Sequence, residues 1–356
     1  MARIFMDGGE LLRTDGFNLR EQSGLPPPNV NFDQVVKRGG VASFKMDAGS
    51  GTLGLGVFFG VSYPALYLRV AFKFNRLTDP KPWIGILSAG NSSGWGPTVA
   101  YNGLGSFGLF AGCRYNINIA YTPVQTMWRA GGTVFDPNAW HIVELFVDGE
   151  NGQAILKVNG VTQAAKTGGL GSGFTSFDRF MFGIGNLGYG GGASAWFDDI
   201  AVNDTSGPTE NSWCGPGGVY LLKPNADQSP LEWSPSAGTT HYALVNETPV
   251  DINDYIYAET PGTADRFGLS DLPPQAREVR AVQPIGYFAL TEAGEAWVRM
   301  RLVSGDSSYD AGTAYLVTVH PNAEHRRFAI LSQSPFTGSA WTTEEVNGLS
   351  LQVEIA

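Results

Sequence analysis

The acidic pairs of this sequence are the residues best suited by type to do chemistry, because two facing carboxyl groups can cleave a glycosidic bond. A retaining glycoside hydrolase holds its two carboxyl groups about 5 Å apart across the sugar bond. Asp198 and Asp199 are adjacent, so on a strand they are expected to point to opposite faces. Glu144 and Asp148 have a suitable spacing, but Phe146 stands between them and Asp148 begins a turn. Hydrolysis is therefore the weakest of three functional hypotheses.

Other short motifs match catalytic or phosphate-binding signatures only in their letters. Gly90–Gly94 reads G-x-S-x-G, but Trp95-Gly96-Pro97 follows it where a nucleophile elbow needs a helix. Gly49–Gly54 and Gly183–Gly188 read G-x-G-x-x-G, and neither opens a helix that could bind a pyrophosphate. The four histidines lack the spacing of a zinc site. The sequence thus predicts no catalytic residue, and we expect a protein that is not an enzyme.

Two further sets of residues are candidate binding groups. Asp198, Asp199 and Asn203 carry the oxygen ligands that calcium prefers, although capping of the backbone is an ordinary alternative role for such side chains. Trp95 lies in a Ser/Gly-rich stretch and Tyr189 lies among glycines, so both rings are expected on exposed loops. Exposed aromatic rings stack on sugars and anchor protein interfaces. Both rings are therefore candidates to contact a glycan or another subunit, with incidental exposure as the alternative.

Strands must position these candidates, because the apolar residues recur at every second position. Leu66–Asn75 alternates apolar and polar residues and predicts a half-buried strand. Trp140–Gly160 predicts a β-hairpin, whose turn Asp148–Gly152 contains the Gly and Asn that tight turns favour. Apolar residues of both strands of this hairpin are expected on one face: Val143, Leu145, Val147, Leu156 and Val158. No segment of ten or more residues has the period of a helix.

The strand patterns fall into two groups. The first forty residues are expected to form an irregular arm, and strand patterns then continue to Asn203. Asp204–Pro208 has the composition of a linker or sharp turn. More strand patterns follow, ending in the alternating segment Leu349–Ile355, which is expected inside a sheet. The sequence therefore predicts an all-β protein with two tandem antiparallel β-sandwiches, in domains 1–205 and 206–356.

The charge is concentrated in the second predicted domain. Residues 1–205 carry 15 basic and 15 acidic side chains, which leaves 8 basic and 18 acidic ones for residues 206–356 and accounts for the net charge of −10. An acidic surface repels phosphates, so a nucleic-acid partner is not expected. No apolar run is long enough to span a membrane. The two cysteines, Cys113 and Cys214, are too few for a disulfide framework.

The hairpin resembles one in the laminin-G-like branch of the concanavalin A-like jelly rolls. The matching residues are Trp140, His141, Asp148, Gly149, Asn159 and Gly160. The segment Trp196–Asp204, W-F-D-D-I-A-V-N-D, also resembles the closing strand of such domains. The resemblance implies that the first domain is a jelly roll, in which this strand lies next to the N-terminal strand.

Longer blocks resemble virion structural proteins of tailed bacteriophages. They are the M-A-R-I-F-x-D-G opening, Trp196–Gly207, Asn211–Pro224, Trp233–Tyr242 and Ser334–Leu349. The resemblance implies a structural protein on the exterior of a phage particle, at the tail or decorating the capsid, assembled in the bacterial cytoplasm. Its expected partners are other virion proteins, further copies of itself and host surface glycans. The alternative hypothesis, a carbohydrate-binding lectin module, depends on Trp95 and Tyr189.

Overall fold

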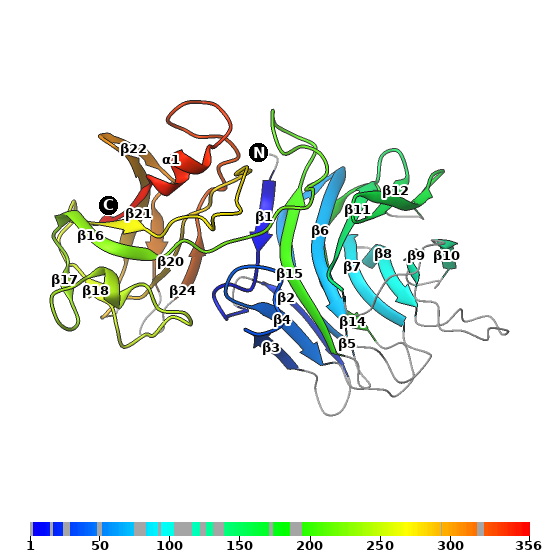
Figure 1. Ribbon diagram of the computed structural model, residues 1–356, viewed down its shortest axis with the longest axis horizontal. Helices are drawn as coiled ribbons and strands as arrows, with labels where there is room; N and C mark the ends of the chain where they lie inside the picture. Colours follow the sequence, from blue (N-terminus) through cyan, green and yellow to red (C-terminus); the bar gives the residue numbers. More distant parts are fainter. Residues whose placement is uncertain are drawn as a thin grey trace. The chain divides into compact units, whose positions relative to one another are not determined.

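In the computed structural model the chain forms two compact units (Figure 1). The jelly-roll unit comprises Ala2–Glu10 and Phe17–Val219, and the C-terminal unit comprises Met1, Leu11–Gly16 and Tyr220–Ala356. The structure describes residues 3–14, 17–23, 29–47, 52–74, 83–91, 94–102, 116–121, 126–130, 139–170, 174–185, 194–292, 294–318 and 324–356. No helix within these ranges is long and apolar enough to cross a membrane.

Two antiparallel sheets pack face to face in the jelly-roll unit. The eight-stranded sheet has the spatial order β13 (Val161–Lys166), β12 (Gln153–Val158), β11 (His141–Asp148), β6 (Ala65–Phe74), β15 (Ser194–Asn203), β4 (Ser43–Asp47) and β3 (Asn29–Asp33), with β1 (Arg3–Asp7) also paired to β15. The seven-stranded sheet has the order β10 (Thr126–Ala130), β9 (Asn116–Tyr121), β8 (Gly94–Asn102), β7 (Trp83–Asn91), β14 (Phe177–Gly185), β5 (Thr52–Tyr63) and β2 (Leu19–Ser23).

The core between these sheets is built from the alternating apolar positions of both. Leu66, Leu68 and Val70 of β6 are almost completely buried, because the pleat of the strand directs every second side chain inward. Aromatic rings join the two layers: the centroid of the Phe182 ring lies 5.4 Å from that of Phe197. The predicted all-β fold class, with a concanavalin A-like jelly roll, is confirmed.

The predicted hairpin forms as expected from its turn residues. Val143 pairs with Val158 and Leu145 pairs with Leu156, and all four side chains are buried. In the turn, the Asp148 carboxylate accepts a hydrogen bond from the backbone N–H of Asn151 at 2.9 Å. Such a bond holds the chain reversal in place.

The first forty residues differ from their prediction as an irregular arm, because they contain β1, β2 and β3. These strands are short and have polar residues at many positions, so their sequences lack the alternation of a half-buried strand. β1 and β2 pair with the longer strands β15 and β5, and β3 pairs with β4, which pairs in turn with β15. As the resemblance implied, the N-terminal strand β1 pairs with β15, with Phe5 opposite Val202.

The segment 204–219 packs on the outer face of the eight-stranded sheet. The Trp213 ring contacts Tyr67 edge-on, at 5.3 Å between centroids, and the Lys157 ammonium group lies 3.8 Å from the centroid of the same indole. Two hydrogen bonds fix the next turn: Gly215 donates to the Glu144 carboxylate at 2.8 Å and accepts from Arg69 at 3.0 Å. Side chains on this outer face are therefore buried although they are polar.

The C-terminal unit contains one larger sheet and two small ones (Figure 1). The six-stranded sheet has the order β16 (Pro224–Leu231), β19 (Ala264–Leu269), β25 (Ser350–Ile355), β21 (Ala296–Ser304) and β22 (Ser307–Asp310), with β23 (Tyr315–Val317) also paired to β21. The small sheets pair β17 (Ser234–Pro235) with β18 (Ile256–Tyr257) and β20 (Ile285–Phe288) with β24 (Glu324–Arg327). The helical segments are η1 (Tyr242–Leu244) and α1 (Thr343–Asn347).

One face of the six-stranded sheet is apolar and the other is polar. Phe267, Val298 and Val353 are buried on the apolar face. The alternating C-terminal segment forms β25, which lies between β19 and β21, so its predicted place inside a sheet is confirmed.

Candidate functional site

The two aromatic residues predicted to bind glycans differ in what the structure describes. Trp95 lies in β8, where it pairs with Gly90 of β7, rather than in an open loop. Its backbone is described, but its side chain lies outside the described residues, as does the whole of Tyr189 and of Cys113. The expected role of Trp95 and Tyr189 in glycan binding therefore stays a prediction.

The prediction that Asp198 and Asp199 point to opposite faces is wrong, because β15 contains a β-bulge. The register with β6 shifts between Asp198 and Ala201, and Asp199 has a positive φ of 51°. Such a bulge breaks the strict alternation of side chains. Both carboxylates consequently contact Arg38: Asp198 accepts its backbone N–H at 2.9 Å, and Asp199 forms an ion pair with its guanidinium.

The predicted calcium ligands are already bonded to protein groups. Asp199 accepts a hydrogen bond from the backbone N–H of Val219 at 2.7 Å. The Asn203 amide bonds to Arg3 and donates to the carbonyl of Ser212 at 2.8 Å. Within the described ranges no three His, Cys, Asp or Glu side chains lie close enough to hold a metal ion. These groups instead fasten the segment 204–219 to the sheet.

Two carboxyl groups in this region have strongly perturbed acidity. Burial, together with the nearby charges of Asp198 and Asp199, raises the pKa of Glu10 from 4.5 to about 8, against a hydrogen bond from Val41 that lowers it. Burial and Asp199 likewise raise the pKa of the Asp198 carboxyl. Glu10 Oε1 is buried and has no hydrogen-bond partner among the described residues. Both groups are therefore expected to hold a proton near neutral pH.

Glu144, which the sequence offers with Asp148 as a possible hydrolytic pair, has a structural role. Only 3% of its surface is exposed, and its Oε1 accepts the Gly215 N–H. Asp148, its expected partner on the strand, bonds within the hairpin turn. The buried Glu144 carboxyl and the Asp148 carboxyl in the turn therefore have separate structural roles.

A row of residues crosses four adjacent strands of the seven-stranded sheet. Arg179 of β14 lies opposite Phe58 of β5 on one side and opposite Gly90 of β7 on the other. Gly90 in turn lies opposite Trp95 of β8. Neighbouring strands are about 4.8 Å apart, so the row Phe58–Arg179–Gly90–Trp95 spans roughly 14 Å. We call these four residues the cross-strand row.

A β-bulge directs Arg179 outward. Contacts with Asp178 and Phe58 then hold its guanidinium in place. Phe177 and Phe180 are both buried in the core, so the two residues between them turn away from it. Arg179 Nε donates to the Asp178 carboxylate at 2.6 Å, and the guanidinium lies 5.3 Å from the centroid of the Phe58 ring. This arrangement combines an ion pair with a cation–π contact and limits the freedom of the Arg179 side chain.

Phe58 is held by its backbone while its ring stays accessible. The Asn18 side chain donates to the Phe58 carbonyl at 2.9 Å and accepts its N–H at 2.6 Å, which extends the pairing of β2 with β5. The Phe58 side chain is nevertheless 43% exposed, unusual for a large apolar residue within a strand. Gly90 has no side chain and is buried, so β7 contributes no exposed group at its place in the row.

This arrangement can bind a flat ligand that carries hydroxyl groups. The exposed aromatic face provides a stacking surface, and the oriented guanidinium provides hydrogen-bond donors beside it. Sequence reasoning singled out Trp95 but missed Phe58 and Arg179. The only sequence signal was the adjacent Asp178-Arg179 pair after an apolar residue, which becomes informative only when the strand order is known.

Comparisons with known proteins found matches among solved structures alone. No protein-family model matches the sequence, and no curated protein does. Among solved structures, a cellulose-induced protein, Cip1, matches 60% of this chain and 100% of its own, with 14% identity and a TM-score of 0.44. An endo-β-1,4-glucuronan lyase from the fungus Trichoderma reesei matches 57% of this chain and 96% of its own, with 15% identity and a TM-score of 0.43.

These matches correct one prediction from the sequence. The chain was expected not to be an enzyme, and that expectation is contradicted because the matched structures include the glucuronan lyase and alginate lyases. The alginate lyase AlgAT5 matches 45% of this chain and 77% of its own, with 10% identity and a TM-score of 0.35. The structures named here include no phage virion protein.

Proposed function

We propose that the jelly-roll unit binds carbohydrate on the outer face of its seven-stranded sheet, along the cross-strand row. The observation that carries this proposal is the half-exposed Phe58 ring beside the fixed Arg179 guanidinium. Aromatic rings pack against the apolar faces of sugar rings, and a guanidinium donates hydrogen bonds to their oxygens. In the backbone register the row continues from Arg179 through Gly90 of β7 to Trp95 of β8.

Replacing Phe58 by alanine is expected to weaken glycan binding by about tenfold, because a stacked ring contributes roughly 1.5 kcal/mol. Arg179→Gln is expected to weaken it by a similar factor, since the oriented hydrogen-bond donors of the guanidinium are lost. The measurement is a glycan-array screen of the full chain, followed by calorimetric titration of the best ligand with each variant.

Val61→Ala is the matched control for this experiment. Val61 lies in the same strand, is 55% exposed and is outside the row, so its loss should leave the affinity unchanged. Because Phe58 is half-exposed, its replacement should also leave thermal unfolding close to that of the unmodified protein. Equal affinities for Phe58→Ala and Val61→Ala would refute the role of the row, and an array without any bound glycan would refute the function.

We propose in addition that the protein acts on the exterior of a tailed-phage particle, where it contacts other virion proteins and further copies of itself and attaches to host surface glycans. The sequence blocks Trp196–Gly207, Asn211–Pro224 and Ser334–Leu349 support this proposal. They supply β15, the segment that packs on the eight-stranded sheet, and α1, so the blocks follow structural elements of both units.

The virion proposal predicts that the chain is found in purified particles in a fixed copy number. Quantitative mass spectrometry of particles, purified from a lysate of the producing cells, measures this number directly. Recovery of the chain only in the soluble fraction of the lysate, with none in intact particles, would contradict the proposal while leaving carbohydrate binding to be judged by its own experiment.

A further inference from the structure

The polar face of the six-stranded sheet in the C-terminal unit carries a second ordered row of side chains. The register places Gln228, Arg266, Gln352, Arg301 and Asp310 opposite one another across β16, β19, β25, β21 and β22. Side chains at opposed positions share a sheet face. Amide and guanidinium groups thus follow one another across five strands, over about 19 Å.

The arginines at one end of this face are neutralised by the protein itself. Arg301 pairs with Glu354 and, at 2.6 Å, with Asp310, while Arg299 pairs with Glu354 at 3.2 Å. Linked ion pairs of this kind hold their side chains in one geometry. The pKa of Arg301 is raised because hydrogen bonds and charges of Asp310 and Glu354 outweigh its partial burial. Neither arginine therefore has a free charge for a ligand.

Arg266 differs from these two arginines. Its Nε is buried and has no hydrogen-bond partner, and no carboxylate of the described residues forms an ion pair with its guanidinium. Its one bond is a long one, 3.5 Å from Nη2 to the Ser350 hydroxyl. A partly buried guanidinium with unused donors favours an anion that can accept two parallel hydrogen bonds.

The neighbours of Arg266 define which anion suits the face. The Ser350 hydroxyl donates to the Gln228 amide at 2.7 Å, and the Gln228 amide lies close over Gly268, where a Cβ would come within 2.9 Å of its nitrogen. These groups both donate and accept hydrogen bonds, as sugar hydroxyls require. One unpaired guanidinium among amides suits one carboxylate among hydroxyls better than a row of phosphates.

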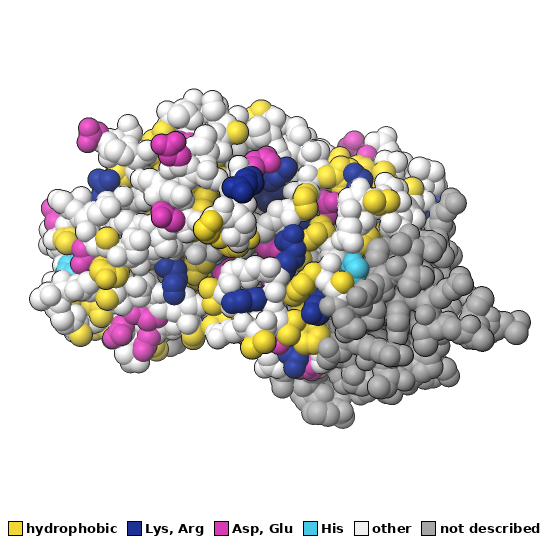
Figure 2. Space-filling model, viewed as in Figure 1, with side chains coloured by type: hydrophobic (Ala, Val, Ile, Leu, Met, Phe, Trp, Pro, Cys, Tyr) yellow, Lys and Arg dark blue, Asp and Glu magenta, His cyan; other side chains and the backbone are white. Residues whose placement is uncertain are grey.

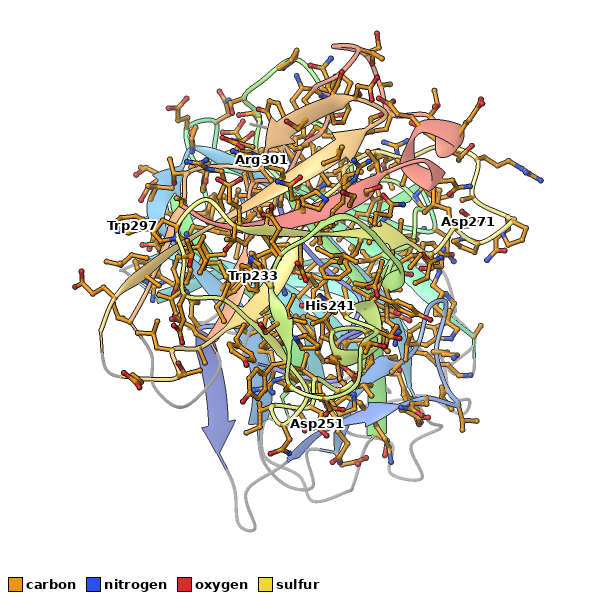
Figure 3. The ribbon with its side chains drawn as sticks, turned by 90° about the vertical axis from the view of Figure 1, so that its left-hand side faces the viewer. Trp233, His241, Asp251, Asp271, Trp297 and Arg301 are labelled. Atoms are coloured by element: carbon orange, nitrogen blue, oxygen red, sulfur yellow. The ribbon has the colours of Figure 1, made fainter. Side chains whose placement is uncertain are left out.

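An exposed aromatic ring completes the face. Trp297 lies on β21 at the position two residues before Arg299 and four before Arg301, so all three share the polar face. Its side chain is 48% exposed, whereas Val303 and Ser350 at the other end are buried, so the face is open toward Trp297. Trp297 and Arg301 are labelled in Figure 3, where Trp297 lies at the margin of the unit.

We propose that this face binds an acidic polysaccharide, with a uronate carboxylate on Arg266 and a sugar ring on Trp297. The segment from Ser206 onward is acidic, with 18 acidic and 8 basic side chains, and Figure 2 shows acidic side chains at several separate places over this unit. Arg266 is thus a local site of positive charge in a negative surrounding, and this favours a ligand with spaced carboxylates over a densely charged polyanion.

The experiment compares two probes of equal length, tetragalacturonate and cellotetraose, by calorimetric titration of the full chain. Tetragalacturonate is expected to bind and cellotetraose to bind at least tenfold more weakly. Arg266→Gln should weaken tetragalacturonate binding about tenfold or more, since a charge-assisted pair is lost. Trp297→Ala should weaken it severalfold.

Arg277→Gln is the matched control, because Arg277 is exposed, lies outside the sheet and loses the same charge on substitution. The affinity of the Arg277→Gln variant for tetragalacturonate should equal that of the unmodified protein. Phe58→Ala in the jelly-roll unit should leave this binding unchanged, which separates the outcome from that of the cross-strand row. Absence of tetragalacturonate binding, equal binding of cellotetraose, or an Arg266→Gln variant that binds like Arg277→Gln would overturn the proposal.

Discussion

Replacing Asp265 by alanine is expected to lower the free energy of unfolding of the C-terminal unit by about 3 kcal/mol. Asp265 is completely buried, and its Oδ1 accepts the backbone N–H groups of Glu232 and Trp233 at 2.7 and 2.9 Å. Its Oδ2 lies 2.6 Å from Nδ1 of the buried His241. Alanine would remove all three bonds and leave the imidazole of His241 without this partner in an enclosed site.

Urea denaturation followed by tryptophan fluorescence measures this effect, because Trp233 lies beside Asp265 and donates its indole N–H to Thr263 at 3.1 Å. Asp271→Ala is the matched control, since Asp271 is exposed and its loss should change stability by less than about 0.5 kcal/mol. Both aspartates are on the same unit, and Figure 3 labels Asp271 and His241. If the two variants unfold at the same urea concentration, the hydrogen bonds of the Asp265 carboxylate do not stabilise this unit.

The jelly-roll unit is expected to become less stable as the pH rises from about 5 to 9. Glu10 has a pKa of about 8 in the folded state and near 4.5 when unfolded. Between these values the folded protein holds a proton that the unfolded chain has released, so each rise in pH favours unfolding. The stabilisation is complete below about pH 4.5 and is lost as the pH passes 8, at a cost of about 2–4 kcal/mol.

The Glu10→Gln variant tests whether Glu10 causes this pH dependence of stability, because glutamine keeps the shape of the protonated acid and does not ionise. The variant is expected to flatten the dependence of unfolding free energy on pH, while the raised pKa of Asp198 leaves a residual slope of the same sign. Other charged groups around Glu10, namely Asp7, Asp199 and Arg38, remain in place. Denaturation is measured at intervals from pH 5 to pH 9.

Glu150→Gln provides the reference for this series. Glu150 is exposed in the hairpin turn, so its substitution should preserve the slope of the unmodified protein. A Glu10→Gln variant with the same slope as Glu150→Gln would show that the buried carboxyl does not control the pH dependence.

Local patterns were sufficient to predict the strands that carry a regular alternation or a recognisable turn in their own sequence. The hairpin around Asp148 was predicted with its buried face because both strands and the turn lie within twenty residues. β6 was predicted because its alternation is regular over its whole length. β1 to β3 were missed because their own patterns are short and weak: β1 and β2 pair with β15 and β5, and β3 pairs with the equally short β4.

The candidate sites depended on information that the sequence pattern does not contain. Phe58 and Arg179 lie 121 positions apart, and only the order β5–β14–β7–β8 brings them together. Bulges at Asp178 and at Asp199 then change which side chains share a face, so the rule of strict alternation misplaced Asp198 and Asp199. The same limits hid the row through Arg266, whose members come from five separate strands.

The central place of β25 in its sheet has a consequence for how this protein is made. Residues 350–355 lie between β19 and β21, so the edge of each strand that faces β25 has no hydrogen-bonding partner until translation has passed these residues. Strand edges that remain unpaired can form hydrogen bonds with another chain. A ribosome that stalls shortly before Ser350 would therefore release a chain with two unpaired strand edges, and such fragments should be aggregation-prone and depend on chaperones for clearance.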